Sequence, residues 1–328
     1  MSVPEINVCP GTLAAGFDTY SKTALKRIFQ GKKVHHVLPY DSPKFDLETD
    51  ELFDENRKHI SISGVQEKYS VLLYKNKLRL VNEGEYGTHI LKPIPGAGKL
   101  AHQMPANEHL TMQIARQLYG IETAENALIF FKDGSPAYIT KRFDVKDDGS
   151  KLAQDDFASL AERTPQTHGE HYKYDGNYLQ LFELMKRYLP TYKIEAPKLF
   201  KILVFNYLFS NGDAHYKNFS ISETSMGDYK LSPAYDLLNS RIHIEDKDFA
   251  LNDGLLPRNL AQGKMNFQFA KLAEKAEITD KIFKDIMLLM CSKSALVEKL
   301  VSVSFLNETT KRNYWQSYQR RLKQLMKL

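Results

Sequence analysis

The stretch Asn211-Gly212-Asp213-Ala214-His215-Tyr216-Lys217-Asn218 follows an apolar run from Leu199 to Phe209. A run of this length and composition favours a buried helix, which would end where the polar residues begin. A second polar stop, Ser232-Pro233-Ala234-Tyr235-Asp236, lies further along the chain. The sequence therefore predicts a buried helix that leads into a loop with a carboxylate, a lysine and an amide, followed by a second carboxylate.

These residue types are the ones that phosphoryl transfer uses: a carboxylate to orient a hydroxyl, then an Asn and an Asp to hold metal ions. The interval from Asp213 to Asn218 equals that between the base and the metal-binding Asn of the protein-kinase catalytic loop, although Lys217 stands further from the Asp than the lysine of that loop. A polar turn that only ends a helix is the alternative, with Asp236 as a helix cap. His215 could ligate a metal or serve as a structural hydrogen-bonding residue.

Composition limits the class of protein. The chain has 328 residues, 42% hydrophobic and 26% charged, which is typical of a globular protein of about two domains. A net charge of +5 is too small for nucleic-acid binding over the whole surface. The two cysteines, Cys9 and Cys291, form no disulfide framework, and neither a membrane-length run nor a signal peptide is evident. We therefore expect a cytoplasmic protein that does not bind membranes.

Periodicity divides the chain into a β-rich part and a helical part. Strands are predicted at 69–74, 78–82, 88–92, 127–131 and 137–143, and helices accompany them at 20–30 and 105–119. Further helices are predicted at 156–163, 178–188, 194–209, 267–275, 279–290, 293–301 and 308–325. The prediction is an α+β fold with two lobes: a small antiparallel-sheet N-lobe at 1–150 and an all-helical C-lobe at 151–328.

Three further features of the sequence have two interpretations each. Lys92 at a strand end and Glu108 on the next helix could form the ion pair by which kinases hold phosphates, or be two surface charges. The small-residue loop Ser61–Lys68 could cover phosphates with its backbone N–H groups, or be an ordinary turn. The basic segment Lys311–Leu328 reads as a solvated amphipathic helix, with a nucleic-acid or partner patch as the alternative.

Together these residues resemble the HipA-type serine/threonine kinases, the toxin components of bacterial toxin–antitoxin systems, and the resemblance implies a bilobal, protein-kinase-like HipA fold. The motifs come in family order over about residues 60 to 240. They are Ser61–Lys68, Thr88–Pro93, Asn107-Glu108, Ile114-Ala115-Arg116, Arg142-Phe143-Asp144, Asp156-Phe157, Asn211–Asn218 and Ser232–Leu237. The Ser-Ile-Ser motif near the start is similar to that of HipT, a shortened form whose missing subdomain is a separate protein, HipS. Lys141 is a departure, because HipA kinases commonly have Glu there.

The resemblance implies a role for each matching residue. Asp213 would be the catalytic base, Lys217 would neutralise the transferring phosphoryl group, and Asn218 and Asp236 would hold Mg²⁺. The positions expected to bind ATP are Ser63, Gly64, Gln66, Lys92, Glu108, Lys141, Phe143, Asp144 and His215. Among these, the segment from Lys141 to Phe143 would meet adenine, and Asp144 would lie near the ribose. Ser61, with Ser63 as the alternative, would be autophosphorylated, and the added charge should oppose ATP binding.

The resemblance also implies an activity and partners. The chain would be an ATP- and Mg²⁺-dependent protein serine/threonine kinase that acts as a toxin by phosphorylating a translation component such as an aminoacyl-tRNA synthetase. HipS-like or HipB-like antitoxins would be its protein partners, and DNA would be reached only through an antitoxin. A small-molecule or lipid kinase and a catalytically silent nucleotide-binding module are the alternatives. Non-classical secretion of the protein into a host also stays open.

Overall fold

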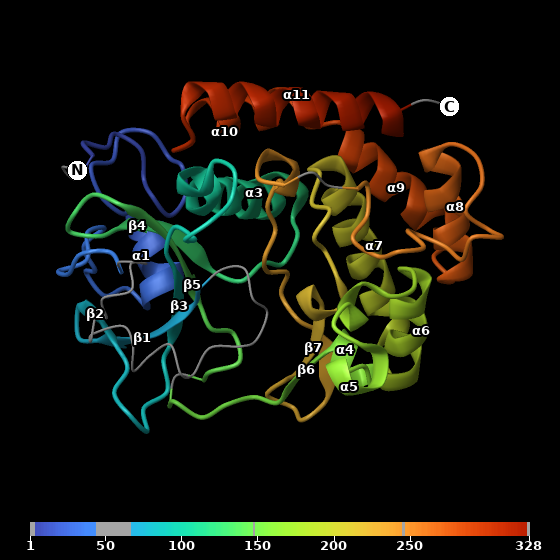
Figure 1. Ribbon diagram of the computed structural model, residues 1–328, viewed down its shortest axis with the longest axis horizontal. Helices are drawn as coiled ribbons and strands as arrows, with labels where there is room; N and C mark the ends of the chain where they lie inside the picture. The colour runs from blue at the N-terminus through green and yellow to red at the C-terminus, as the bar shows by residue number, and fades with distance from the viewer. Residues whose placement is uncertain (1–3, 44–66, 147, 245–246, 327–328) are drawn as a thin grey trace. The chain divides into compact units, whose positions relative to one another are not determined.

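The computed structural model describes residues 4–43, 67–146, 148–244 and 247–326 (Figure 1). The chain forms two compact units. Unit 1 comprises 1–113, 124–150 and 299–311, and unit 2 comprises 114–123, 151–298 and 312–328. Helices α3 (Met104–Tyr119) and α11 (Glu308–Leu325) each contribute residues to both units. The predicted domains 1–150 and 151–328 therefore stay a prediction.

Unit 1 is built around a five-stranded antiparallel sheet with the strand order β2-β1-β3-β5-β4. Its strands are β1 (Tyr69–Tyr74), β2 (Lys77–Leu80), β3 (His89–Lys92), β4 (Asn126–Phe130) and β5 (Pro136–Lys141). Leu91 lies opposite both Tyr69 and Ile139, so β3 is central in the sheet, and Leu91 is fully buried. All the strands predicted in this part of the chain are present, with small shifts at their ends.

Helix α1 (Lys22–Phe29) packs on this sheet, and specific residues cap both of its ends. The Ser21 hydroxyl accepts a hydrogen bond from the Ala24 N–H at 3.2 Å, and Gln30 takes a left-handed conformation that ends the helix. Ile28 and Phe29 join a core with the inward side chains of β1 and β3. Ser21 is therefore the N-terminal cap of this helix.

Unit 2 contains a small sheet as well as helices, so the prediction of an all-helical C-lobe is wrong in this respect. Strands β6 (Gln154–Asp156), β7 (Ser220–Glu223) and β8 (Tyr229–Leu231) form an antiparallel sheet in that order. Each strand has only three or four residues, and β6 pairs with residues far away in sequence, so no local alternation marks this sheet. The helix predicted at 156–163 shrinks to α4 (Phe157–Leu160), because Asp156 belongs to β6 and caps the helix.

Five further helices are close to their predictions: α6 (Leu179–Tyr188), α7 (Tyr192–Leu208), α8 (Met265–Lys275), α9 (Asp280–Cys291) and α10 (Ser294–Ser302). The short helix α5 (Pro165–His168) and the 3₁₀ turns η1 (Ala101–Gln103), η2 (Tyr172–Tyr174), η3 (Tyr216–Asn218) and η4 (Ser240–Ile242) were not predicted. Helix α7 is buried along most of its length and leads to the loop at 211–218. None of the helices within the described ranges has an apolar stretch of membrane-spanning length.

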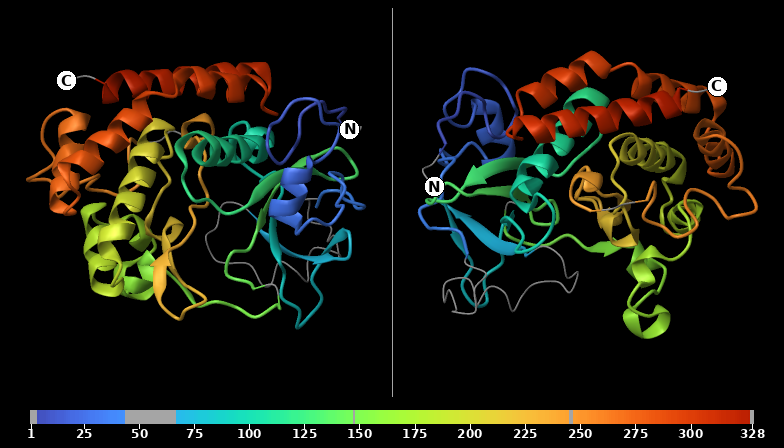
Figure 2. Two further views of the ribbon diagram at one scale, coloured as in Figure 1. Left: turned by 180° about the vertical axis from the view of Figure 1, so that it is seen from behind. Right: turned by 45° about the horizontal axis from the view of Figure 1, so that its top comes forward.

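Helix α11 confirms the amphipathic helix predicted from the C-terminal segment (Figure 2). Tyr314, Tyr318 and Leu325 on its apolar stripe are buried, and Tyr318 stacks on Phe209 at the end of α7 with ring centroids 5.0 Å apart. One member of the buried face is charged: Arg321 is only 2% exposed. A buried arginine on an otherwise apolar face has to be explained by its partners.

Candidate active site

The loop at 211–218 begins just after α7 ends, where the chain turns. Ser210 takes a left-handed conformation with φ of 54°, and the Asn211 N–H donates to the Asn206 carbonyl at 2.8 Å. Hydroxyl groups from elsewhere in unit 2 then hold the backbone: Ser240 accepts from the Gly212 N–H at 2.8 Å, and Tyr178 donates to the Ala214 carbonyl at 2.7 Å. The loop is therefore fixed by specific hydrogen bonds, as a preorganised site requires.

Asp213 lies on this loop with one carboxylate oxygen already bonded. The hydroxyl of Tyr174, in η2, donates to its Oδ1 at 3.0 Å. The Tyr174 ring also stands edge-on to the His215 ring, with centroids 5.1 Å apart. Tyr174 is not predictable from the sequence, since nothing in the spacing of η2 and the loop indicates that they meet.

Asn218 and Asp236 come together. The Asn218 amide donates to Asp236 Oδ2 at 3.3 Å, while its Oδ1 accepts from the His215 N–H at 3.1 Å. Asp236 has a φ of 56°, which is uncommon outside glycine and carries a local backbone cost of roughly 1 kcal/mol or more. Asn211 supports this conformation by donating to the Asp236 carbonyl at 3.3 Å. The strained backbone turns the carboxylate of Asp236 toward the loop that bears Asp213.

His215 is a neutral residue at this site. Its side chain is buried, and loss of solvation lowers its pKa to about 3, with smaller effects from Lys173 and Lys217 in the same direction and from Asp236 in the opposite one. Its Nδ1 has no hydrogen-bond partner among the described residues. At neutral pH it therefore adds no positive charge beside the two aspartates.

The oxygen-rich pair Asn218 and Asp236 fits a magnesium ion better than a transition metal. Within the described ranges, no three or more His, Cys, Asp or Glu side chains are grouped as metal ligands. Mg²⁺ does not need such a cage, because it is usually held by one or two carboxylates together with substrate phosphates and water. The residues present thus suit a Mg²⁺ ion that arrives with a nucleotide.

Lys92 and Glu108 form a buried ion pair in unit 1. Lys92 Nζ lies 2.6 Å from Glu108 Oε1, and the two side chains are only 4% and 2% exposed. The ammonium group also lies 5.1 Å from the centroid of the Tyr138 ring. The alternative of two surface charges is therefore wrong, and the pair has the form that kinases use to orient a phosphate-binding lysine.

The segment from Lys141 to Asp144 is already engaged in internal contacts. The N–H groups of Lys141 and Arg142 donate to the carbonyls of Glu125 and Thr88 at 2.7 and 2.9 Å. Arg142 binds both carboxylate oxygens of Asp144, at 3.0 and 2.5 Å. A nucleotide could not use those two N–H groups without breaking these bonds, and it would meet Asp144 as part of an ion pair.

Other predicted site residues are less defined. Ser61, Ser63, Gly64 and Gln66 lie outside the described residues. Lys217 is half-buried in η3, and its side chain has no hydrogen bond or ion pair with another described residue. Their roles stay predictions.

Comparison with known sequences identifies the family. The family model of the HipA-like C-terminal domain matches residues 60–296. The Sinorhizobium fredii protein Y4dM, described as a candidate kinase, is 31% identical over 268 residues that cover 77% of this chain and 62% of Y4dM. A Haemophilus influenzae protein with the same description is 25% identical over 227 residues, covering 67% of this chain and 63% of the relative. The chain thus spans about three fifths of the length of these relatives.

Two solved structures share the fold. HipA from a Shewanella oneidensis MR-1 toxin–antitoxin complex with HipB and operator DNA aligns with a TM-score of 0.63 and 17% identity, over 81% of this chain and 64% of that one. The proinflammatory kinase CtkA of Helicobacter pylori aligns with a TM-score of 0.52 and 15% identity, over 78% of this chain and 92% of that one. These similarities confirm the predicted α+β, HipA-like fold, and the sequence match supplies the family. The chain belongs to the family of the HipA-like C-terminal domain.

Proposed function

We propose that this protein is an ATP- and magnesium-dependent kinase of HipA type that transfers a phosphoryl group to a serine or threonine hydroxyl. The observation that carries the proposal is the contact between Asn218 and Asp236, made beside the loop that presents Asp213. An aspartate, an asparagine and a second aspartate in this relation are the parts that kinases use at the transferring phosphate.

Each residue has a proposed task. Asp213 accepts the hydrogen bond of the substrate hydroxyl and takes its proton, and Lys217 balances charge on the transferring group. Asn218 and Asp236 hold Mg²⁺, which when bound would offset the negative charge of the nucleotide phosphates. His215, neutral and buried, would lie against the bound nucleotide without repelling the metal.

The nucleotide-binding part of the proposal rests on unit 1. Lys92, oriented by Glu108, would contact the ATP phosphates, and the segment Lys141–Phe143 with Asp144 would meet the nucleoside. The resemblance to HipA kinases supports Ser63, Gly64 and Gln66 as the phosphate loop and Ser61 or Ser63 as the autophosphorylation site.

The biological role is a further part of the proposal. The solved HipA structure contains HipB and operator DNA, which supports a toxin–antitoxin role with a HipB-like partner here. The Ser-Ile-Ser motif supports a HipT-like kinase with a HipS-like partner. Family targets suggest an aminoacyl-tRNA synthetase as substrate.

The test is transfer of label from ATP radiolabelled on the γ-phosphate. Asp213→Asn and Asp236→Asn should each lower transfer by about 100-fold or more, because a catalytic base and a metal ligand typically contribute at least that much. Asp285→Asn makes the same change on an exposed part of α9 and should leave transfer unchanged. Full activity in both site variants would overturn the proposal.

The same assay separates the alternatives. With a cell lysate as acceptor, a protein kinase labels a protein band, whereas a small-molecule or lipid kinase labels a metabolite or lipid fraction. A silent binding module would show an ATP-dependent rise in melting temperature and no labelled product.

A further inference from the structure

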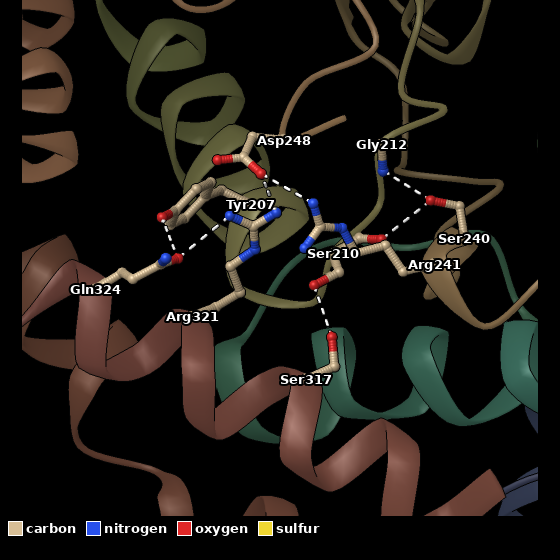
Figure 3. Close-up of polar contacts among 9 residues, drawn as sticks. All are labelled: Tyr207, Ser210, Gly212, Ser240, Arg241, Asp248, Ser317, Arg321 and Gln324. Carbon is tan, nitrogen blue, oxygen red and sulfur yellow. Dashed lines mark hydrogen bonds and ion pairs between the residues drawn. The ribbon is translucent and has the colours of Figure 1, made fainter. Parts of the chain in front are cut away.

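Ser210 lies just after α7, before the turn that leads to Asp213, and hydrogen bonds join it to Ser240 of η4 and Ser317 of α11 (Figure 3). Its carbonyl accepts from the Ser240 hydroxyl at 3.0 Å, and the same hydroxyl oxygen accepts from the Gly212 N–H at 2.8 Å. The Ser210 side chain meets the hydroxyl of Ser317 in α11 at 2.9 Å. A chain of hydroxyl contacts thus runs from α11 through Ser210 and Ser240 to the residue before Asp213.

Arg321 extends the same helix face by one turn. Its guanidinium lies 4.6 Å from the centroid of the Tyr207 ring of α7, and its Nη2 binds Asp248 Oδ1 at 2.6 Å. Asp248 Oδ1 also binds Arg241 at 3.1 Å, and Arg241 follows Ser240 in η4. Figure 3 shows Arg321 and Arg241 converging on this one carboxylate. Gln324 completes the group by accepting from the Tyr207 hydroxyl at 3.0 Å.

Stability alone is a poor explanation for a charge at this position. Arg321 is buried but its partner Asp248 is 44% exposed, so solvent screens the ion pair and limits what it adds to stability. The neighbours of Arg321 on this helix, Tyr318 and Leu322, are buried apolar residues. The arginine orients its partner, because its planar guanidinium group holds the segment containing Asp248 against α11 at a defined angle. Ser317 does the same for the end of α7.

We infer that α11 is a positioning element for the catalytic loop, with Ser317 and Arg321 as its positioning residues. The two residues are four positions apart on one helix, so they lie on the same face. Ser317 holds the segment just after α7 through Ser210. Arg321 holds the stretch after Asp236 through Asp248, which also binds Arg241. The inference rests on the proposed function, since it assigns the loop that α11 holds to catalysis.

The first arm of the test measures catalysis. Ser317→Ala and Arg321→Met should lower kcat by about 10-fold with the KM for ATP within about twofold of wild type, because small misplacements of a catalytic group are costly to the chemical step. Ser317→Thr keeps the hydroxyl and Arg321→Lys keeps the charge, so each should recover part of the loss. Gln319→Ala, on the exposed face of α11, is the matched control.

The second arm measures the coupling without nucleotide. Hydrogen exchange of the amides at 210–214 and 236–243 should be at least several-fold faster in Ser317→Ala and Arg321→Met than in wild type or Gln319→Ala. If Arg321→Met does not fold, Ser317→Ala carries the test alone, because it removes only one hydroxyl.

Two results would overturn the inference: folded variants with wild-type kcat and wild-type exchange, or activity that falls only in proportion to the folded fraction. The failure of the proposed function looks different, because wild type itself would then transfer no phosphate. If wild type is active, Asp213→Asn is inactive and Ser317→Ala behaves as wild type in both arms, only the inference about α11 fails.

Discussion

The hydrogen bond from Tyr174 to Asp213 decides how the carboxylate is presented. A hydroxyl bonded to Oδ1 at 3.0 Å restricts the rotation of the Asp213 side chain. A hydrogen bond to a charged group contributes about 1.5–3 kcal/mol, which is enough to hold one rotamer. Tyr174 is therefore a positioning residue for the proposed base.

Tyr174→Phe should lower kcat by about 10-fold, because a loss of about 1.4 kcal/mol in the orientation of Asp213 corresponds to that factor. Steady-state phosphotransfer assays measure the effect. Tyr172→Phe removes a hydroxyl from the same turn that has no hydrogen bond with another described residue, and it should be neutral. A higher kcat in Tyr174→Phe would instead mean that Tyr174 blocks the base.

At this scale, residue type and spacing within a motif pointed to candidate site residues, whose roles stay predictions. Asp213, Asn218 and Asp236 were identified from residue type and spacing, and the contact between Asn218 and Asp236 agrees with that pairing. Tyr174 and Ser240 were missed, because each acts through one hydroxyl brought in by the tertiary fold. A tyrosine or serine in a polar stretch carries no sign of such a contact.

Helix α7 is connected to the small sheet of unit 2 by one buried carboxylate. Glu195 accepts from the N–H of Leu231, at the end of the edge strand β8, at 3.3 Å. Edge strands expose backbone donors that need a partner when they are buried. Glu195 supplies this partner at the point where the chain leaves β8 for the segment that contains Asp236.

Glu195→Ala should lower the free energy of unfolding by about 1–3 kcal/mol, because the buried Leu231 N–H would be left without its acceptor. Urea unfolding of the purified variants measures the change. Glu195→Gln keeps an acceptor oxygen and should lose less. Lys198→Ala, which removes the half-exposed ion-pair partner of Glu195, should cost under about 1 kcal/mol. Equal losses in the alanine and glutamine variants of Glu195 would contradict this role.

Helices and strands whose apolar residues repeat at a regular spacing could be predicted from the sequence, and those without such a repeat could not. The core strands β1, β3 and β5 and the long helices α3, α7 and α11 appear near their expected positions, since their apolar residues repeat at strand or helix spacing. The sheet β6-β7-β8 has strands of three or four residues and a pairing that spans more than 60 positions of the chain, from Asp156 to Ser220. Its stability comes from tertiary contacts, so local periodicity could not indicate it.

On the scale of the whole molecule, three buried histidines make folding sensitive to acid. Loss of solvation lowers the pKa of His89 to about 4 and those of His109 and His215 to about 3. In the unfolded chain a histidine titrates near pH 6.5, so the unfolded state binds more protons than the folded state below that pH. The stability associated with these groups is therefore present above pH 6.5 and is lost as the pH falls toward 4.

His109 gives the clearest test, because its Nε2 has no hydrogen-bond partner among the described residues and burial alone accounts for its lowered pKa. Each such histidine should cost about 1.4 kcal/mol per pH unit below 6.5, or about 2 kcal/mol at pH 5. His109→Leu should remove one such contribution, so its loss of stability between pH 7.5 and pH 5 should be about 2 kcal/mol smaller than that of wild type. Urea unfolding at pH 7.5, 6 and 5 measures the difference, and comparing the two slopes cancels any packing change that is equal at all three pH values. A slope identical to wild type would mean that His109 becomes protonated without unfolding the protein, and that the acid sensitivity arises elsewhere.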